Sequence, residues 1–349
     1  MPEIVRLGRE HEDLLKGFLE STPEASVYHT AEWRDAVIAT YGYSAEYLAS
    51  LEKGKIAALL PLMLVKSWLT GTRLVSLPFA NICGPIGRRD HFPALLDRAL
   101  ALAGERKAKA LEIRTQAGLN TFEDPRFASV SFFLTSIMDL DPDPQKIWKA
   151  FPSGGIRTEV RQAEKRGLTV ERATTLDDLA RFYDLFARLR LKFGVPPQPY
   201  AFFLNLWNHL GPDHSRLYVA RHEGRTIGGL FSLGFGTALC GSYIGSDPAY
   251  RPSRVHQILY WKTIEAACLE GYKMFDFLRT AKKDEGIRFF KQRWNAREVD
   301  LEYRYYPEVR GTAATVEETG KYALLTGVLK HAPFFVGKAV GGMIYRHTG

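Results

Sequence analysis

The chain has 349 residues, of which 46% are apolar and 25% are charged. This balance is typical of a soluble globular protein, and the length fits two domains of ordinary size. The longest clean apolar run, residues 56–65, is shorter than the roughly 20 residues of a membrane-spanning helix. The N-terminus lacks the apolar core of a signal peptide. We therefore expect a cytoplasmic protein.

The net charge of +8 can be accounted for by two short stretches. Residues 145–167 contain six Lys and Arg against two Glu, and residues 282–297 contain six Lys and Arg against one Asp and one Glu. Clustered positive charge indicates an anionic partner more strongly than scattered charge does. A phosphate-bearing partner is our default expectation.

Two segments of the chain predict the same order of elements. In the first half, a hairpin over 48–64 is followed by a strand over 73–79, a helix over 92–109 and a strand over 110–115. In the second half, the matching elements are residues 219–235, 239–246, 256–273 and 274–280. Apolar residues recur at helical spacing in both helices.

Single residues also match between the halves. The turn glycines Gly54 and Gly224 lie 170 residues apart, and a carboxylate stands in each last strand, as Glu112 and Asp276. Such a long period indicates two similar domains rather than a solenoid. The Pro-Asp segment 141–145 is the candidate linker. We therefore expect an N-terminal domain over 1–144, a C-terminal domain over 145–310, and a helical tail over 311–349.

The cysteines and histidines predict no special chemistry. Cys83, Cys240 and Cys268 form no paired motif and stand among apolar neighbours, so we expect buried, inert thiols. The nine histidines show no metal-ligand spacing, and we predict no metal site.

The order of hairpin, strand, loop, helix and strand resembles the GNAT acyltransferase fold, a mixed α/β fold. Three motifs, "YHTAEWRDAV", "RTEVRQAEKRGL" and "FDFLRTAKKDEGIRFFKQRW", resemble in their order the Fem family of tandem-GNAT transferases. The similarity is greatest to FemAB-like proteins associated with exopolysaccharide and PEP-CTERM systems. This chain differs where the family has Gly-Arg-Ser, because it has Leu278-Arg279-Thr280.

The resemblance implies an enzyme that transfers an acyl or aminoacyl group to an amine. Fem proteins take an amino acid from aminoacyl-tRNA and attach it to a peptidoglycan precursor. We therefore expect aminoacyl-tRNA as the favoured donor and a cell-envelope or polysaccharide precursor as the acceptor, with no bound cofactor. Acyl-CoA is the alternative donor, and a non-catalytic scaffold that binds RNA or precursor is the alternative class.

Amide formation needs a neutral amine, donors for the oxyanion, and two substrates held together. A carboxylate can help to supply the neutral amine, and we assign this role to Asp276. Lys291 matches the lysine of the family's Phe-Lys motif, which implies that it offsets charge on the oxyanion or on the leaving hydroxyl. Arg279 matches the family arginine and is expected to contact phosphate, unless it pairs with Asp276.

A CoA-binding GNAT cradles pyrophosphate on a glycine loop that opens a helix. The corresponding segment is "YRPSRVHQIL", where Arg251 stands at the first position and Arg254 and His256 stand where glycines are needed. Their side chains hinder close approach to the backbone, which weakens CoA as the donor. Arg251 itself is either a phosphate ligand or a solvated loop residue.

The remaining candidates for substrate binding each have a structural alternative. Arg157 and Arg161 would share one face of a helix, which is either a binding face or a solvated one. Tyr243 faces the cleft or the core, and Trp33 in an amphipathic helix is often a core residue. Phe290 and Trp294 either stack on bases or belong to the core. The further candidates are Arg288 and Arg190.

The tail combines apolar residues with Lys330, Lys338 and Arg346. It either lies on an anionic membrane, where a lipid-linked acceptor would be, or docks on the body of the protein. The first alternative would place the enzyme at the inner face of the membrane.

Overall fold

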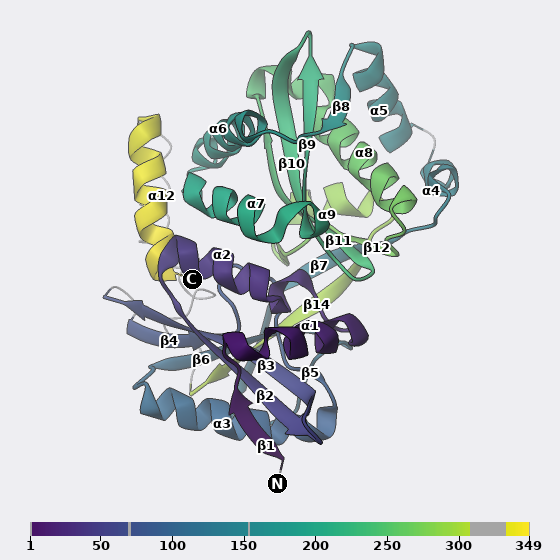
Figure 1. The fold of residues 1–349 in the computed structure, drawn as a ribbon. Coiled ribbons are helices and arrows are strands. Elements are labelled where there is room, and N and C mark those ends of the chain that lie inside the picture. Colours follow the sequence, from purple (N-terminus) through teal and green to yellow (C-terminus); the bar gives the residue numbers. More distant parts are fainter. Residues whose placement is uncertain (1, 69–70, 153, 308–332, 349) are drawn as a thin grey trace. The chain divides into compact units, whose positions relative to one another are not determined.

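The structure is a computed structural model that describes residues 2–68, 71–152, 154–307 and 333–348 (Figure 1). Its contacts divide the chain into two compact units. Among the described residues, the first unit contains 2–133, 299–307 and 343–348, and the second contains 134–298 and 333–342. Within these residues, no helix is both long and apolar enough to cross a membrane.

This division differs from the boundaries expected from the sequence. The first unit ends at Phe133 rather than at residue 144, and it takes back the segment that begins at Val299. The reason is strand pairing, since β14 (Arg297–Tyr306) lies antiparallel to β6 (Ala110–Gln116). A linear reading of the sequence assigns β14 to the second domain because it follows that domain's other elements.

The sheet of the first unit has the order β1-β2-β3-β4-β6-β14, and β5 pairs with β3. The remaining strands are β1 (Glu3–Arg6), β2 (Ser44–Glu52), β3 (Lys55–Ser67), β4 (Gly71–Val75) and β5 (Ile86–Gly87). Helix α3 (Phe92–Glu105) covers one face, and α1 (Glu12–Ser21) and α2 (Ala31–Tyr41) lie on the other. Because both faces are covered, the apolar run in β3 is buried almost throughout.

The sheet of the second unit has the order β7-β12-β11-β10-β9-β8. Its strands are β7 (Ala128–Asp139, of which residues 134–139 belong to this unit), β8 (Thr169–Arg172), β9 (Ser215–His222), β10 (Arg225–Phe235), β11 (Ala238–Ser246) and β12 (Met274–Asp276). A further short strand, β13, is formed by Thr280–Ala281. The closing strand β7 precedes the other elements of this unit in the chain.

Helices cover both faces of the second sheet. On one side lies α8 (Val255–Leu269), with α4 (Pro144–Ala150) and α5 (Ile156–Lys165) packed against it. On the other side lie α6 (Leu176–Lys192) and α7 (Tyr200–His214). Helix α9 (Glu285–Gln292) follows β13, and Trp294, just beyond it, joins the core beneath α8.

The repeated hairpin expected from the sequence is present in both units. The turn residues are Lys53-Gly54 and Glu223-Gly224, and all four have positive φ. This is the geometry of a type I′ turn, which matches the twist of the flanking strands. Each hairpin also has a one-residue bulge, at Ala57 in the first and at Ile227 in the second. These bulges are separated by the same 170 residues as the glycines, which supports a duplication.

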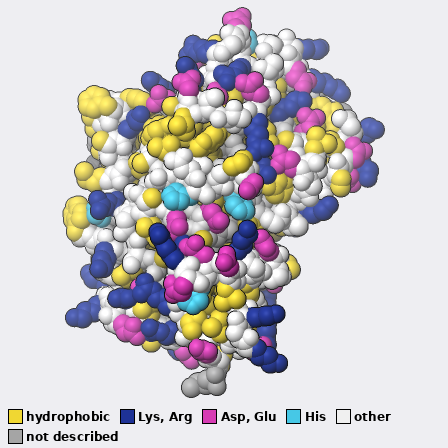
Figure 2. All heavy atoms as spheres, in the orientation of Figure 1, with side chains coloured by type: hydrophobic (Ala, Val, Ile, Leu, Met, Phe, Trp, Pro, Cys, Tyr) yellow, Lys and Arg dark blue, Asp and Glu magenta, His cyan; other side chains and the backbone are white. Residues whose placement is uncertain are grey.

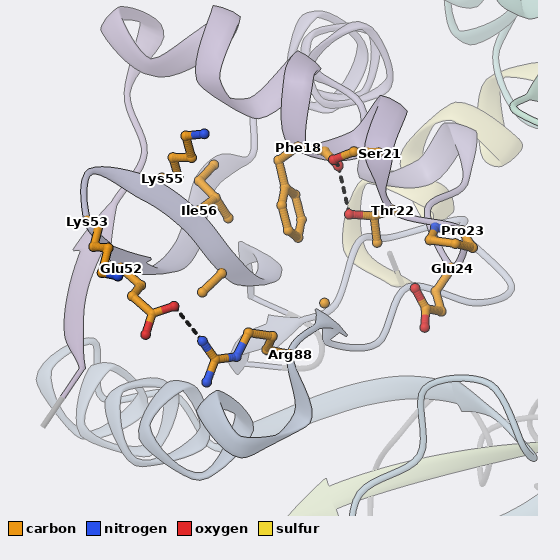
Figure 3. Close-up of a pocket in the computed structure, with 12 residues that line it drawn as sticks. Phe18, Ser21, Thr22, Pro23, Glu24, Glu52, Lys53, Lys55, Ile56 and Arg88 are labelled. Atoms are coloured by element: carbon orange, nitrogen blue, oxygen red, sulfur yellow. Dashed lines mark hydrogen bonds and ion pairs between the residues drawn. The ribbon is translucent and has the colours of Figure 1, made fainter.

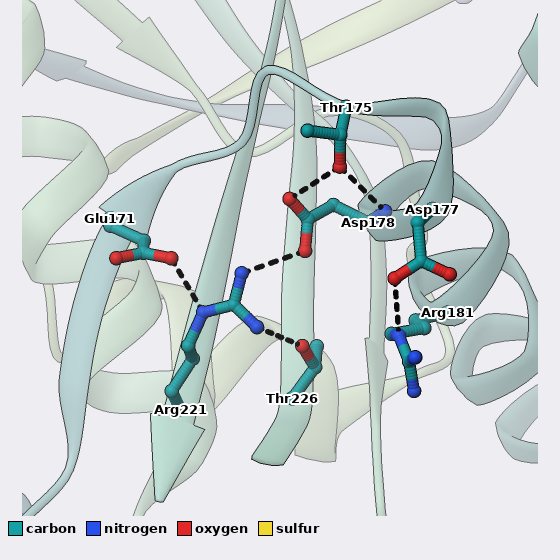
Figure 4. Close-up of polar contacts among 7 residues, drawn as sticks. All are labelled: Glu171, Thr175, Asp177, Asp178, Arg181, Arg221 and Thr226. Carbon is teal, nitrogen blue, oxygen red and sulfur yellow. Dashed lines mark hydrogen bonds and ion pairs between the residues drawn. The ribbon is translucent and has the colours of Figure 1, made fainter. Parts of the chain in front are cut away.

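A network centred on Arg221 joins the edge of the second sheet to α6 (Figure 4). The guanidinium on β9 pairs with Glu171 on β8, and it donates to Asp178 at 2.8 Å and to Thr226 on β10 at 2.8 Å. The Thr175 hydroxyl in turn donates to Asp178 at 2.9 Å and caps the start of α6. The Arg221 guanidinium therefore links β8, β9, β10 and the start of α6, which is a structural role.

Each unit also contains one short parallel pairing at its centre. In the first, Arg73–Val75 of β4 run beside Ala110–Glu112 of β6, and in the second, Ala238–Cys240 of β11 run beside Met274–Asp276 of β12. Each pairing ends after three residues, although β11 continues to Ser246. Glu112 and Asp276 occupy the same last position of their pairings.

The tail expected over 311–349 lies partly outside the described residues. The described part of it is α12 (Phe334–Thr348) together with Pro333. Within the second unit, Gly337 approaches Leu191, and Gly341 approaches the backbone of Pro197 so closely that an added Cβ would lie 2.1 Å from the carbonyl oxygen. Glycine at Gly341 therefore permits this contact between helix and loop.

Candidate active site

Asp276 ends β12 at the point where the parallel pairing with β11 stops. Its carboxylate is buried in the second unit, and its Oδ1 atom accepts hydrogen bonds from the Thr135 hydroxyl and from the Leu278 backbone N–H at 2.7 Å. Burial raises the pKa of Asp276, while these two donors partly oppose the rise. A carboxylate with a raised pKa is a stronger base than an exposed one.

Lys291 on α9 is the second buried charge in this region, and its side chain is only 5% exposed. Its Nζ atom donates to the Leu278 carbonyl oxygen at 2.5 Å and to the Thr280 hydroxyl at 2.6 Å. Burial lowers the pKa of Lys291 to about 8, against the attraction of nearby carboxylates that include Asp276. The ammonium is therefore a better proton donor at neutral pH than an exposed lysine.

Leu278 connects the two charged groups through its backbone. Its N–H donates to Asp276 and its carbonyl accepts from Lys291, which fixes the turn between β12 and β13. Leu278 has φ +62°, a left-handed conformation in which a side chain is costly. This is the position where the family motif has glycine, and here a leucine adopts the glycine conformation.

Asp276 and Lys291 influence each other without direct contact. No ion pair joins them within the described residues, yet Lys291 lowers the pKa of Asp276 and Asp276 raises that of Lys291. Asp276 Oδ2 accepts no hydrogen bond from any residue that the structure describes, and two hydrogen bonds leave one of the three Lys291 donors unused. The arrangement therefore provides one base and one acid in a low-dielectric setting.

The start of α8 is where a GNAT fold would bind pyrophosphate, and it is occupied by side chains. Arg254 is the N-cap residue and has φ +60°, so a non-glycine residue again holds a left-handed position. The Glu159 carboxylate on α5 lies 3.4 Å from Arg254 and 2.8 Å from Arg293. His256 and the Ser246 hydroxyl form a hydrogen bond of 2.8 Å. Burial and, to a smaller extent, the positive charge of Arg251 lower the pKa of His256 to about 4.

Three arginines predicted to bind substrate lie in the second unit near these elements. Arg279 follows Leu278 and is exposed, and Arg251 is exposed in the loop before α8. Arg288, in contrast, donates two hydrogen bonds to Glu298 at 2.9 and 2.8 Å and a third to the Lys282 carbonyl. The charge of Arg288 is therefore used within the unit.

Tyr243 and Arg190 lie on the other side of the second sheet. Tyr243 is half-buried on β11 among phenylalanines, with ring centroids 5.1 Å from Phe203 and 6.0 Å from Phe186. Arg190 is half-buried on α6, where its guanidinium lies 5.9 Å from the Phe186 ring. The two predicted residues therefore share one aromatic neighbour.

Trp33 is a core residue of the first unit, not a surface for substrate. It is fully buried and packs edge-on against Tyr28 with centroids 4.8 Å apart. The prediction that it binds substrate is therefore wrong, because no part of the side chain is accessible. The core alternative also holds for Trp294, which is fully buried, and for Phe290, which packs against the same cluster.

Arg157 and Arg161 lie on α5 as expected. Arg157 is half-exposed and forms no ion pair with any residue in the described ranges, and exposed Arg161 lies 5.8 Å from the Trp148 ring. The three cysteines are buried, and burial raises the pKa of each thiol, so none resembles an activated nucleophile.

Three residues of the site were given no role by reasoning from sequence. Thr135 lies 141 positions from Asp276 on a different strand, and no local motif marks it. Glu159 stands in a segment that we interpreted only by its arginines. Thr280 was quoted as part of the motif but given no role, although a hydroxyl at the family's serine position was a usable signal.

A cavity of about 600 Å³ lies in the first unit, between the end of α1, the hairpin turn and β5 (Figure 3). Phe18 and Ile56 form its apolar wall, and the Glu52–Arg88 ion pair crosses its rim. Both members of this pair are about half exposed, so the cavity is an open, solvated hollow. It contains none of the predicted site residues and lacks a buried acid or base.

Within the described residues, no group of three or more His, Cys, Asp or Glu side chains is placed to hold a metal ion.

The comparisons identify the fold. Residues 153–292 match the family model described as an acetyltransferase (GNAT) domain. The crystal structure of FemX has a TM-score of 0.66 at 17% identity, covering 86% of this chain and 96% of that one. No curated protein sequence gives a significant match.

Two further structures have the same architecture. The C-terminal domain of a putative lysylphosphatidylglycerol synthetase from Agrobacterium fabrum has a TM-score of 0.62 at 14% identity, covering 88% of this chain and 96% of that one. A tandem GNAT protein from the clavulanic acid biosynthesis pathway has a TM-score of 0.53 at 13% identity, covering 87% and 98%. The mixed α/β chain is thus a tandem GNAT fold, as expected, and identities this low establish the fold alone.

Proposed function

We propose that this protein is an N-acyl or N-aminoacyl transferase whose active site lies in the second unit. The observation that carries the proposal is the buried pair Asp276 and Lys291, held by one turn where the β11–β12 pairing ends. Buried groups with pKa values shifted toward neutrality are typical of acid–base sites. At the matching position in the first unit, the Glu112 carboxylate is paired with the Arg114 guanidinium at 2.7 Å.

Asp276 is the proposed base. An amine acceptor enters as an ammonium ion and must lose a proton before its nitrogen can attack a carbonyl carbon. The carboxylate takes that proton, and its raised pKa makes the transfer less unfavourable. The nitrogen then forms a bond to the carbonyl carbon, and the carbonyl oxygen becomes an oxyanion.

Lys291 is the proposed acid. As the tetrahedral intermediate collapses, the bond from carbon to the leaving oxygen breaks, and that oxygen takes a proton from the ammonium. A pKa near 8 keeps Lys291 largely protonated at neutral pH and lets it release the proton readily. The attacking nitrogen, which is positively charged in the intermediate, gives its second proton to the now neutral Lys291 amine, and Asp276 releases its proton to solvent. The products are an amide, a free hydroxyl and one proton, and both side chains return to their starting states.

The start of α8 favours an aminoacyl ester, carried by tRNA, over acyl-CoA as the donor. Phosphates of CoA would need the backbone N–H groups at this helix start. Glu159 places a carboxylate beside Arg254 in that position, and a like charge repels phosphate. The cations of α5 and of the loop before α8, including Arg157, Arg161 and Arg251, provide positive charge that suits an RNA backbone.

The acceptor is proposed to be an amine on a cell-envelope precursor, by analogy with what Fem proteins modify. An acyl-CoA-dependent N-acyltransferase is the second candidate, favoured by the match of residues 153–292 to an acetyltransferase domain model. Exopolysaccharide precursors are included among the acceptors because of the family resemblance in the sequence. We place the reaction in the cytoplasm, where charged tRNA is found.

A donor screen tests the proposal. The protein is mixed with an amine-bearing precursor and either tRNA charged with a radiolabelled amino acid or labelled acetyl-CoA, and the label recovered as an alkali-stable amide is counted. We expect transfer from charged tRNA and little from acetyl-CoA, and about 10²–10⁴-fold less transfer with Asp276→Asn. Transfer from acetyl-CoA alone would favour the second candidate, and no transfer from any donor would favour a non-catalytic scaffold.

A further inference from the structure

Helix α12 presents an apolar face to solvent, the reverse of the usual arrangement for a surface helix. In its first two turns, Phe335 is 74% exposed, Ala339 is exposed, and Val336 and Val340 are half-exposed. The spacing of these residues places them along one side of the helix. Met343 continues the stripe at 63% exposure.

The opposite side of α12 already has its partners within the second unit. Gly337 packs on Leu191, and Phe334 lies under the Arg188 guanidinium at 4.4 Å. Lys338 pairs with Asp184 at 3.3 Å and lies 4.7 Å from the Tyr183 ring. Docking of the helix on α6 is therefore achieved by one face, and it leaves the apolar face uncovered by any described residue.

The charges around this face are positive. Arg188 and Lys192 are exposed on the part of α6 that touches α12, and Asp184 is neutralised by Lys338. The 15 residues of α12 contain no Asp or Glu, and Arg346 adds a further cation to this helix. Phe193, two residues beyond Leu191, adds a further 63% exposed aromatic side chain. Figure 2 shows hydrophobic side chains gathered along α12, with Lys and Arg nearby.

We propose that this face binds the surface of an anionic lipid bilayer, with α12 lying in the plane of the interface. An exposed apolar stripe flanked by Lys and Arg and free of acids is the pattern of an interfacial helix, in which Phe side chains enter the acyl boundary and cations meet anionic headgroups. The apolar stripe by itself would fit a protein partner equally well. The cations favour the bilayer.

Vesicle flotation of the full chain tests the proposal. Vesicles of phosphatidylcholine alone are compared with vesicles that also contain phosphatidylglycerol. We expect binding to the anionic vesicles that weakens as salt is added. Phe335→Ser should lower the partition coefficient on the order of tenfold, since one exposed aromatic side chain is removed. Lys192→Glu should lower binding to anionic vesicles only.

Leu269→Ser is the matched control. Leu269 is 71% exposed at the end of α8, so the substitution removes a similar apolar surface elsewhere in the second unit. It should leave vesicle binding unchanged, and none of the three variants should lower the melting temperature. The proposal would be overturned if Leu269→Ser and Phe335→Ser had equal effects, or if the wild type ignored anionic vesicles. A dimer that Phe335→Ser converts to a monomer would instead identify the face as a self-interface.

Discussion

Glu112 and Asp276 occupy equivalent positions, each at the end of a three-residue parallel pairing, but their environments differ. The Arg114 guanidinium lies 2.7 Å from Glu112, and both side chains are buried in the first unit. Asp276 has a hydroxyl and a backbone N–H in place of an arginine, and its pKa is raised. Both units thus have a carboxylate at this position, but only the carboxylate of the first unit, Glu112, is paired with an arginine. This is our reason for placing the reaction in the second unit.

Removing the charge should have opposite consequences at the two positions. Glu112→Gln leaves Arg114 buried without its counter-ion, and breaking such a pair typically costs about 3–5 kcal/mol. Asp276→Asn keeps an oxygen for both hydrogen bonds and removes a desolvated charge, so the free energy of unfolding at pH 7 should be unchanged or higher. Transfer activity should fall about 10²–10⁴-fold. Chemical denaturation and the label-transfer assay measure the two effects.

The expected gain in stability of Asp276→Asn follows from the link between protonation of Asp276 and folding. A raised pKa in the folded state means that the Asp276 contribution to stability is fully present below the unfolded pKa and is lost as pH rises through the folded pKa. The Asn side chain of Asp276→Asn does not ionise, so the variant does not lose this stability as pH rises. An Asp276→Asn variant that unfolds more easily than the wild type at neutral pH would contradict this account of the carboxylate.

The duplication could be predicted from the sequence because it rests on local signals. Gly54 and Gly224 mark tight turns whose φ values require glycine, and the apolar periodicity around them fixes strands and helices. Asp276 and Lys291 were assigned from their motif, and the structure places them around one turn. Trp33 was assigned to substrate by a loose motif match, and periodicity alone could not separate a core tryptophan from a functional one.

Other features could not be predicted because they depend on distant contacts. The pairing of β14 with β6 joins residues 185 to 195 positions apart, from Leu301 with Gln116 to Tyr306 with Leu111, so the domain boundary drawn from a linear reading was displaced. Thr135 reaches Asp276 in the same way. Glu159 attracted no attention as one of two acids in a basic helix, yet it forms ion pairs with Arg254 and Arg293 beside the start of α8.

Lys291 should make stability depend on alkaline pH. Its folded pKa of about 8 lies below the unfolded value, so its charge is penalised in the folded protein at neutral pH. Between about pH 8 and pH 10.5 the folded protein binds fewer protons than the unfolded chain, and stability rises with pH by up to about 3 kcal/mol. Lys291→Met has no amino group to titrate, so its stability should not show this rise with pH. The measurement is the difference in free energy of unfolding between wild type and variant at several pH values, and a constant difference would contradict the shift.

Leu278 should reverse the usual ranking of alanine and glycine. Both Leu278→Ala and Leu278→Gly remove the side chain, but only glycine is unstrained at φ +62°. We expect the glycine variant to be more stable by about 1 kcal/mol, whereas glycine in a regular element is less stable than alanine by about 0.5–1 kcal/mol. Leu269 on α8 provides the control pair, for which alanine should be the more stable. If alanine were more stable than glycine at Leu278 as well as at Leu269, the turn at Leu278 would hold no backbone strain.

Glu159 should control anion binding at the start of α8. Glu159→Gln removes the carboxylate while leaving Arg254 and Arg293 in place, so calorimetry should detect stronger binding of pyrophosphate and of acetyl-CoA than in the wild type. Glu164→Gln on the same helix is the control, because Glu164 pairs with Lys262 instead, at 3.6 Å. Micromolar binding of acetyl-CoA to the unmodified protein would show that Glu159 does not obstruct phosphate.

Lys291 should act mainly in the transition state. If its ammonium protonates the leaving oxygen, Lys291→Ala should lower kcat about 10²–10³-fold and change KM little, because the benefit appears as charge develops. Thr280→Val tests the alternative that Lys291 only holds the turn. It removes one of the two acceptors of the ammonium and loosens the same contact, but it keeps the proton donor. We therefore expect a much smaller loss of kcat in Thr280→Val than in Lys291→Ala, with similar melting temperatures. Equal losses in both variants would assign Lys291 a purely structural role, and a loss confined to KM would make it an anchor for the donor.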